Sequence, residues 1–212
     1  MAAEPARPPQ VPLEAGIGPA NPPCPACGEP LFGWATAPDG SPVRRCEACG
    51  LGVVAEPGDQ ADALAVLDRL QVEGGSGLTY RIANRAGLGA WIGGKGWAPI
   101  EPGRGYLFTP EAVRRLAGAR DQELVQTRWL AGAGIVSMWG TMLNSFTFGR
   151  NVALGAIGRA APAPAERGWQ RALDAPISLL ATPIVLLAAA LMETAAGLAG
   201  RGGVLELTLR PR

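Results

Sequence analysis

Alternating apolar and polar residues mark the strands of this chain. Residues 78–83 and 204–209 alternate with a period of two, so that apolar side chains gather on one face of each stretch. Residues 32–34 and 51–54 predict two shorter strands, and residues 123–130 predict another. We therefore expect short strands, one of which lies at the end of the chain.

Apolar residues at helical spacing predict helices between these strands. Asp59 is suited to cap a helix that runs to Leu70 with an apolar stripe. Residues 109–111, Thr-Pro-Glu, form a compact helix start, because they combine a capping hydroxyl, a proline at the first helical position and an acid in the first turn. That helix should end near Gly118, and residues 136–148 predict a third helix.

Residues 175–192 form an eighteen-residue stretch without a charge. A helix of that length spans about 27 Å, close to the thickness of the hydrocarbon layer of a membrane. Pro176 and Pro183 weaken it as one straight span, and a span would separate strand 204–209 from its sheet. We therefore expect a pair of helices, buried or lying on a membrane surface, with a transmembrane span as the alternative.

Composition narrows the classes of function. The chain has 212 residues, a net charge of +1 and no histidine. A charge so close to zero offers no general field for nucleic acid, so no nucleic-acid partner is expected. The lack of histidine excludes His-based triads, His general bases and His metal ligands. Residues 1–22 are rich in alanine and proline without the apolar core of a signal peptide, which predicts a disordered leader and a cytoplasmic location.

Four cysteines carry the strongest chemical signal. They form two Cys-x-x-Cys pairs separated by eighteen residues: Cys24, Cys27, Cys46 and Cys49. Each pair can present two thiolates from one turn, and a glycine follows each pair, so the spacing predicts a closed, structural Zn²⁺ site. Two disulfides, or two separate redox pairs, are the alternatives, and the expected reducing compartment favours zinc.

The order of motifs behind the cysteines resembles the late part of class I S-adenosylmethionine-dependent methyltransferases. A helix that ends at Gly74-Gly75 feeds strand 78–83, and the strand ends at an asparagine, as the fifth strand of that family does. Residues 94–97, Gly-Lys-Gly-Trp, and residues 106–111, Tyr-Leu-Phe-Thr-Pro-Glu, are similar to the segment between the fifth and sixth strands. Strand 204–209 would match the seventh.

The resemblance also covers the cysteines but has a gap. Several family members begin with a four-cysteine ribbon that ends in Cys-x-x-Cys-Gly-Leu, as residues 46–51 do. At residues 57–62 the family would carry its first four strands and the loop that binds the cofactor. Arg104 also stands where the family commonly has a histidine. The resemblance therefore implies a shortened methyltransferase with no catalytic or cofactor-binding residues to carry over.

Two glycine motifs are similar to the glycine loops of nucleotide-binding sites. Residues 132–134, Gly-Ala-Gly, lack a third glycine and an acidic partner, which indicates an ordinary turn. Residues 89–95 match Gly-x-x-x-x-Gly-Lys, but Gly96 stands where a Ser or Thr must bind Mg²⁺. We therefore expect residues 84–106 to form a surface loop.

Together these patterns predict an α+β protein. Its expected parts are a leader, a zinc ribbon, a methyltransferase-like remnant of about three strands with flanking helices, a linker with apolar helices, and a final strand and tail: 1–22, 23–57, 58–150, 151–200 and 201–212.

The predicted function is that of a non-catalytic accessory or interaction protein. Loss of four strands would leave strand 78–83 as an open edge, so we expect a protein partner or a second copy there. Membrane-surface contact is expected through residues 175–199. The alternatives are an active S-adenosylmethionine-dependent methyltransferase, completed by a partner or an unrecognised site, and a small membrane protein with a cytosolic zinc ribbon.

Overall fold

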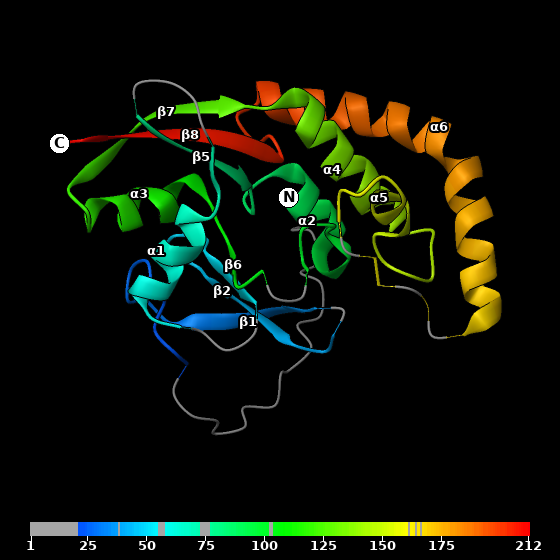
Figure 1. Cartoon of the computed structure of the whole chain (residues 1–212), viewed down its shortest axis with the longest axis horizontal. Coiled ribbons are helices and arrows are strands. Elements are labelled where there is room, and N and C mark those ends of the chain that lie inside the picture. Colours follow the sequence, from blue (N-terminus) through cyan, green and yellow to red (C-terminus); the bar gives the residue numbers. More distant parts are fainter. Residues whose placement is uncertain are drawn as a thin grey trace, which may run out of the picture.

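The fold, taken from a computed structural model, is α+β and contains two four-stranded antiparallel sheets (Figure 1). The structure describes residues 21–37, 39–54, 58–72, 77–101, 104–160, 162–163, 165 and 167–212. Most of the predicted leader, the boundary near residue 57 and the Gly74-Gly75 turn lie outside these residues.

The first sheet carries the cysteine ribbon and has the strand order β1-β2-β3-β6. Its strands are β1 (Leu31–Thr36), β2 (Pro42–Cys46), β3 (Gly52–Val54) and β6 (Tyr106–Leu107). The predicted strands at 32–34 and 51–54 are confirmed. Strand β2 was not predicted, and β6 comes from the stretch that was expected to be a loop. Because β6 pairs with β3, the ribbon sheet is completed by a distant part of the chain.

The second sheet brings together the three strands predicted around Leu78, Leu124 and Leu205. Its order is β4-β5-β8-β7, and its strands are β4 (Gln71–Val72), β5 (Leu78–Ala83), β8 (Val204–Pro211) and β7 (Gln122–Trp129). Every neighbouring pair in this sheet is antiparallel.

Strand β5 is not an edge strand, which corrects the expectation of an open edge at residues 78–83. Residues 79 and 80 pair with β4, and the amide of Arg81 donates to the carbonyl of Leu70 at 3.0 Å. The edges of the sheet are β4 and β7 instead. Binding of a protein partner at β5 stays a prediction, without an open edge to support it.

Two of the helices, α1 (Gln60–Asp68) and α3 (Pro110–Gly118), start where capping residues predict them. The other described helices are α2 (Leu88–Gly93), α4 (Ala131–Leu143), α5 (Val152–Ala156) and α6 (Gly168–Leu198), with a 3₁₀ turn at Gly94–Gly96. Asp59 caps α1 and Thr109 caps α3, each through its side-chain oxygen. Helix α4 begins and ends about five residues earlier than expected.

The expected surface loop at residues 84–106 is wrong in large part. It holds α2, the 3₁₀ turn and the first residue of β6, and its Trp97 is only 1% exposed in a cluster with Ala90 of α2 and Leu107 of β6. The glycines in this stretch serve close packing, because a Cβ atom on Gly93 would lie 2.4 Å from the methyl group of Thr141.

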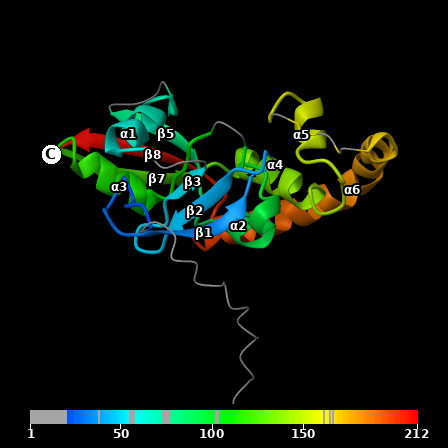
Figure 2. The same ribbon diagram turned by 90° about the horizontal axis from the view of Figure 1, so that it is seen from below.

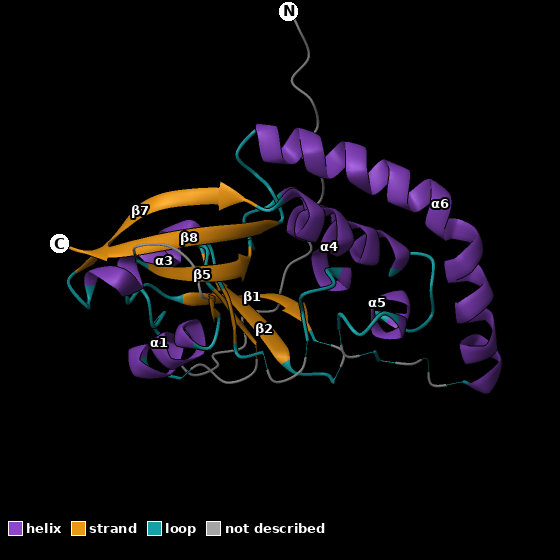
Figure 3. Cartoon of the chain, turned by 45° about the horizontal axis from the view of Figure 1, so that its top comes forward, coloured by secondary structure: helices purple, strands orange, loops and turns teal. Residues whose placement is uncertain are grey.

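Helix α6 is one continuous helix of 31 residues, where a pair of helices was expected. Pro176 and Pro183 lie inside it, on its exposed side, and the helix curves around the molecule (Figure 3). Helix α6 packs along α4. The buried residues of α6 are Asp174, Ser178, Val185, Ala189, Glu193 and Ala196. A curved helix can keep both prolines, because a proline inside a helix removes one hydrogen bond and bends the axis.

The ribbon shares one hydrophobic core with the rest of the protein. Cys24, Cys46 and Leu51 belong to the same buried cluster as Leu116 of α3 and Leu207 of β8. Helices α1 and α3 lie beside β7 and β8 at one end of the molecule, and α4 and α6 lie at the other (Figure 2). The segment that carries the four cysteines therefore rests on the second sheet and its helices.

Candidate metal centre

The four predicted cysteines converge at one point of the structure. Cys24 and Cys27 precede β1, whereas Cys46 ends β2 and Cys49 lies in the following turn. The Cys24 and Cys49 sulfurs are 3.6 Å apart, and those of Cys27 and Cys46 are 3.4 Å apart. All four sulfurs lie within 4.8 Å of one another. Tetrahedral coordination at about 2.3 Å places thiolates about 3.8 Å apart, so the cluster fits a metal ion.

All four cysteines are free thiols, so the structure does not contain the alternative of two disulfides. The short sulfur distances cross between the two Cys-x-x-Cys pairs, because each pairs a residue of one turn with a residue of the other. A bound metal ion would therefore tie two turns that are far apart in the sequence.

Backbone geometry explains the glycine after each cysteine pair. The amide of Gly28 donates to the carbonyl of Cys24 at 2.8 Å, and the amide of Gly50 donates to Cys46 at 3.0 Å. Gly28 has φ +78° and Gly50 has φ +74°, a region that other residues rarely adopt. These turns bend the chain so that the two sulfurs of each pair face the same centre.

Burial gives this site the properties of a closed structural centre. Cys24, Cys46 and Cys49 are at most 3% exposed, and Cys27 is partly buried. Desolvation raises the pKa of the Cys27 thiol to about 11. The pKa of Cys49 is also raised, first by its hydrogen bond with Cys24 and then by burial. Without a cation, these raised pKa values keep these two thiols protonated. A bound cation deprotonates the thiols that coordinate it, so that binding releases protons.

Thr109 connects the metal centre to helix α3. Its hydroxyl donates to the carbonyl of Cys49 at 2.5 Å and accepts from the amide of Ala112 at 3.1 Å. The sequence indicated the helix cap, but it contains no local signal for the contact with the ribbon. One buried side chain thus holds the second cysteine turn against the start of a helix.

A cation–π contact between Arg85 and Trp34 also holds the ribbon in place. The guanidinium of Arg85, just after β5, lies 4.4 Å from the centre of the Trp34 ring on β1. Burial lowers the pKa of Arg85 to about 10, and the aromatic face offers a favourable place for its charge. This contact also joins the ribbon to the second sheet.

The two glycine motifs of the sequence analysis, residues 132–134 and 89–95, lie at helices α4 and α2. Gly132 and Gly134 lie in the first turns of α4, and a Cβ atom on Gly134 would fall 2.2 Å from the carboxylate of Glu193 on α6. Gly89 is the second residue of helix α2, so residues 89–95 do not form a phosphate-binding loop. Gly134 serves the close packing of α4 against α6.

Comparisons with protein-family models, curated proteins and solved structures found no match to this chain. The resemblance to methyltransferases therefore stays a prediction from the sequence. The four-cysteine cluster is the site that the geometry supports, and it can hold a metal ion through four thiolates.

Proposed function

We propose that the chain is a zinc-stabilised, methyltransferase-like accessory protein, non-catalytic on its own, that docks on a membrane surface through α6. The observation that carries the proposal is the broad apolar face that α6 leaves exposed. The zinc site stabilises the body of the protein, and α6 provides its contact surface.

Four thiolates around one centre support zinc as the metal. Zn²⁺ favours tetrahedral sulfur ligands, and a site filled by four cysteines leaves no open position for a substrate. A cytoplasmic location would keep the thiols reduced. Metal analysis of purified protein should find about one zinc per chain. Iron instead of zinc, or two disulfides without metal, would contradict this assignment.

Helix α6 has an exposed side that is almost entirely apolar. Its most apolar eighteen-residue window is only 17% buried, whereas the core helix of a soluble protein is mostly buried. Among the described helices it is long and apolar enough to cross a membrane, by length and composition alone. The exposed apolar residues are Leu173, Leu179, Leu180, Ile184, Leu186, Leu187, Leu191 and Leu198. A continuous apolar face of this kind marks a contact surface for lipid or protein.

Features at the ends of α6 favour lipid as the contact. Arg167 and Arg171 lie at its start and Arg201 follows its end, so basic residues flank the uncharged stretch. Trp169 is 54% exposed and stacks edge to face with Phe148. Aromatic rings and basic side chains beside an apolar face suit the headgroup region of a bilayer.

Buried carboxylates near both ends of α6 favour lying on the membrane over crossing it. Asp174 accepts from the amides of Phe148 and Gly149, at 2.8 and 3.0 Å. Glu193 accepts from the amide of Gly203 at 2.6 Å and from the indole of Trp129 at 3.0 Å. These anchors are about 28 Å apart along the helix. A transmembrane orientation would have to break both, whereas surface contact through the opposite side keeps them.

Vesicle binding tests this surface. Full-length protein should co-sediment with phosphatidylglycerol vesicles, and the double substitution Leu180→Gln/Leu187→Gln should weaken binding at least about tenfold, because both side chains are exposed on α6. Val125→Gln on β7 is the control, because it also replaces an exposed apolar side chain with glutamine but lies outside α6.

Carbonate extraction distinguishes surface contact from a transmembrane span, and it should release the protein from the membrane. Retention would indicate a span, and a stable dimer without vesicle binding would show that a second copy covers the face.

The pairing of β5 with β8 supports the methyltransferase-like part of the proposal. The resemblance assigns β5 and β8 to the fifth and seventh strands, which would have to share a sheet, as they do here. Calorimetric titration of zinc-loaded protein with S-adenosylmethionine should show no binding. Micromolar affinity would favour the alternative of an active enzyme.

A further inference from the structure

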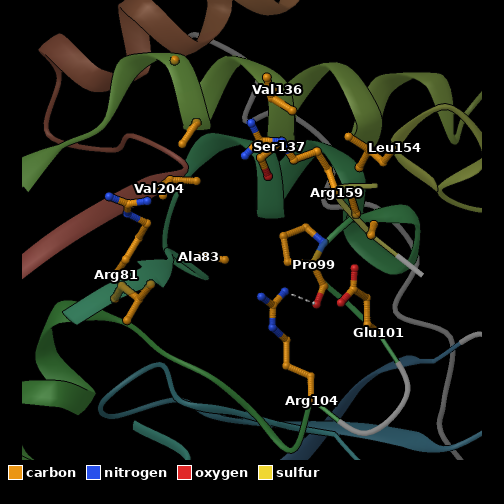
Figure 4. Close-up of a pocket in the computed structure, with 15 residues that line it drawn as sticks. Arg81, Ala83, Pro99, Glu101, Arg104, Val136, Ser137, Leu154, Arg159 and Val204 are labelled. Atoms are coloured by element: carbon orange, nitrogen blue, oxygen red, sulfur yellow. Dashed lines mark hydrogen bonds between the residues drawn. The ribbon is translucent and has the colours of Figure 1, made fainter. Parts of the chain in front are cut away.

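A cavity of about 360 Å³ lies between the second sheet and helix α4 (Figure 4). Its walls come from the end of β5, the start of β8, the first turns of α4, residues 98, 99, 101 and 104, and Leu154 of α5 with residues 159 and 160 after it. Its volume lies within the usual range of small-molecule sites, roughly 300–1,000 Å³. The metal centre and the exposed face of α6 do not contribute to it.

Three arginines line this cavity, and only one acidic residue does. Arg81, Arg104 and Arg159 come from separate parts of the chain and surround the space, with Glu101 beside them (Figure 4). The positive charge of the walls therefore exceeds the negative charge. A guanidinium presents several N–H donors in a plane, which suits the oxygens of a phosphate or a carboxylate.

The described neighbours leave much of this charge available to a ligand. Arg104 donates to the carbonyl of Pro99 at 2.9 Å, and the Glu101 carboxylate offsets part of its charge. Arg81 lies 3.8 Å from the Glu206 carboxylate, and Glu206 is shared with Arg128 at 3.7 Å. Arg159 forms no ion pair with any carboxylate in the described part of the chain.

The start of α4 adds to the same positive potential. Gly132 and Ala133, in its first turn, line the cavity, and the capping position, Leu130, has no side chain that bonds to the helix amides. The first free amides of a helix attract anions, and the helix dipole strengthens this attraction. A Cβ atom on Gly132 would meet nothing within 4 Å, so a ligand can approach the backbone there.

The remaining walls are apolar. They include Ile82, Pro99, Val136, Leu154 and Val204. Inorganic phosphate would leave these walls uncovered, whereas a larger molecule would contact them and the arginines together. The cavity therefore matches an anionic group attached to an apolar or aromatic body.

We propose that this cavity binds a small organic anion, whose phosphate or carboxylate group contacts Arg81, Arg104 and Arg159 while its body packs on the apolar walls. The proposal is independent of the metal at the cysteines and of membrane docking. It assigns a ligand to residues that neither the zinc site nor α6 explains.

Titration calorimetry of the zinc-loaded full chain tests the site with AMP, phenylacetate and inorganic phosphate, and with adenosine as the neutral counterpart of AMP. AMP or phenylacetate should bind, inorganic phosphate should bind more weakly, and adenosine should not bind. Stronger binding of AMP would identify phosphate as the preferred group, and stronger binding of phenylacetate would identify carboxylate.

Three variants connect binding to the cavity. Arg104→Gln and Arg159→Gln should each weaken binding at least about tenfold, because each removes a charge-assisted contact. Arg159 is exposed, so its replacement should leave the fold intact. Ala133→Glu should also abolish binding, although an acid in the first turn of α4 favours the helix. Arg114→Gln, on an exposed face of α3, is the matched control.

The proposal is overturned if none of the three anions binds, or if binding survives Arg159→Gln and Ala133→Glu unchanged. Equal affinity for AMP and adenosine would also overturn it, because the anionic group would then contribute nothing. Increasing salt should weaken genuine binding, since the contacts are charged.

Discussion

At the scale of single residues, Thr109 links the cysteine turn to helix α3. We expect Thr109→Val to destabilise the fold by about 1–3 kcal/mol, because it removes a helix cap and leaves the buried carbonyl of Cys49 without its donor. Urea unfolding of the zinc-loaded protein measures the change. Thr127→Val on an exposed part of β7 is the control and should have little effect. Equal effects of the two substitutions would contradict the role of Thr109.

Glu193 predicts a pH dependence. Burial raises its pKa, although bonds from Gly203 and Trp129 oppose the shift. The folded protein therefore holds the proton more tightly than the unfolded chain does, so this contribution to stability is present below the ordinary pKa of about 4.3. It is lost as the pH rises through the folded-state pKa.

Comparison with Glu193→Gln isolates this contribution, because glutamine does not ionise. The free energy of unfolding of the variant, minus that of the natural protein, should increase as the pH rises from about 4 to 8. Glu123→Gln on the exposed side of β7 controls for the loss of one carboxylate. A difference that falls with pH would have the wrong sign and would exclude the proposed effect of burial.

At the scale of elements, glycines decide how closely α6 approaches its neighbours. A Cβ atom on Gly197 would lie 2.3 Å from the ring of Trp129, whereas one on Gly132 in α4 would meet nothing within 4 Å. Gly197→Ala should therefore destabilise the protein by about 1–2 kcal/mol, because overpacking outweighs the better helix propensity of alanine. Gly132→Ala should stabilise it by about 0.5 kcal/mol. Thermal unfolding of the two variants without ligand measures these effects. Shifts of both melting temperatures in the same direction would contradict the packing argument.

Some of the elements could be predicted from local patterns. Asp59 and Thr109 start helices as expected, since a cap depends on a few neighbouring residues. Strand β8 follows the alternation of its leucines. Strand β2 was missed, because adjacent arginines at residues 44 and 45 break the apolar pattern, and pairing with β1 and β3 stabilises the strand instead.

At the scale of the whole molecule, the shared core couples the metal centre to distant elements. Removing zinc with a chelator should increase hydrogen exchange in α3 and β8 as well as in the ribbon, because all three contribute to one buried cluster. Helix α4 packs in a separate cluster and should change less, which makes it an internal control. Loss of protection confined to residues 24–54 would show that the ribbon folds independently.

The sequence by itself determined the four cysteines of the candidate metal centre, two helix starts and the main strands, since these depend on residue type and short spacing. Only the tertiary structure decided that β6 completes the ribbon sheet, that β4 covers the expected open edge and that α6 is one helix with an exposed apolar face. It also brought together Arg81, Arg104 and Arg159, which share no motif. Local patterns specify backbone preferences, whereas contacts between distant segments depend on which surfaces can be buried together.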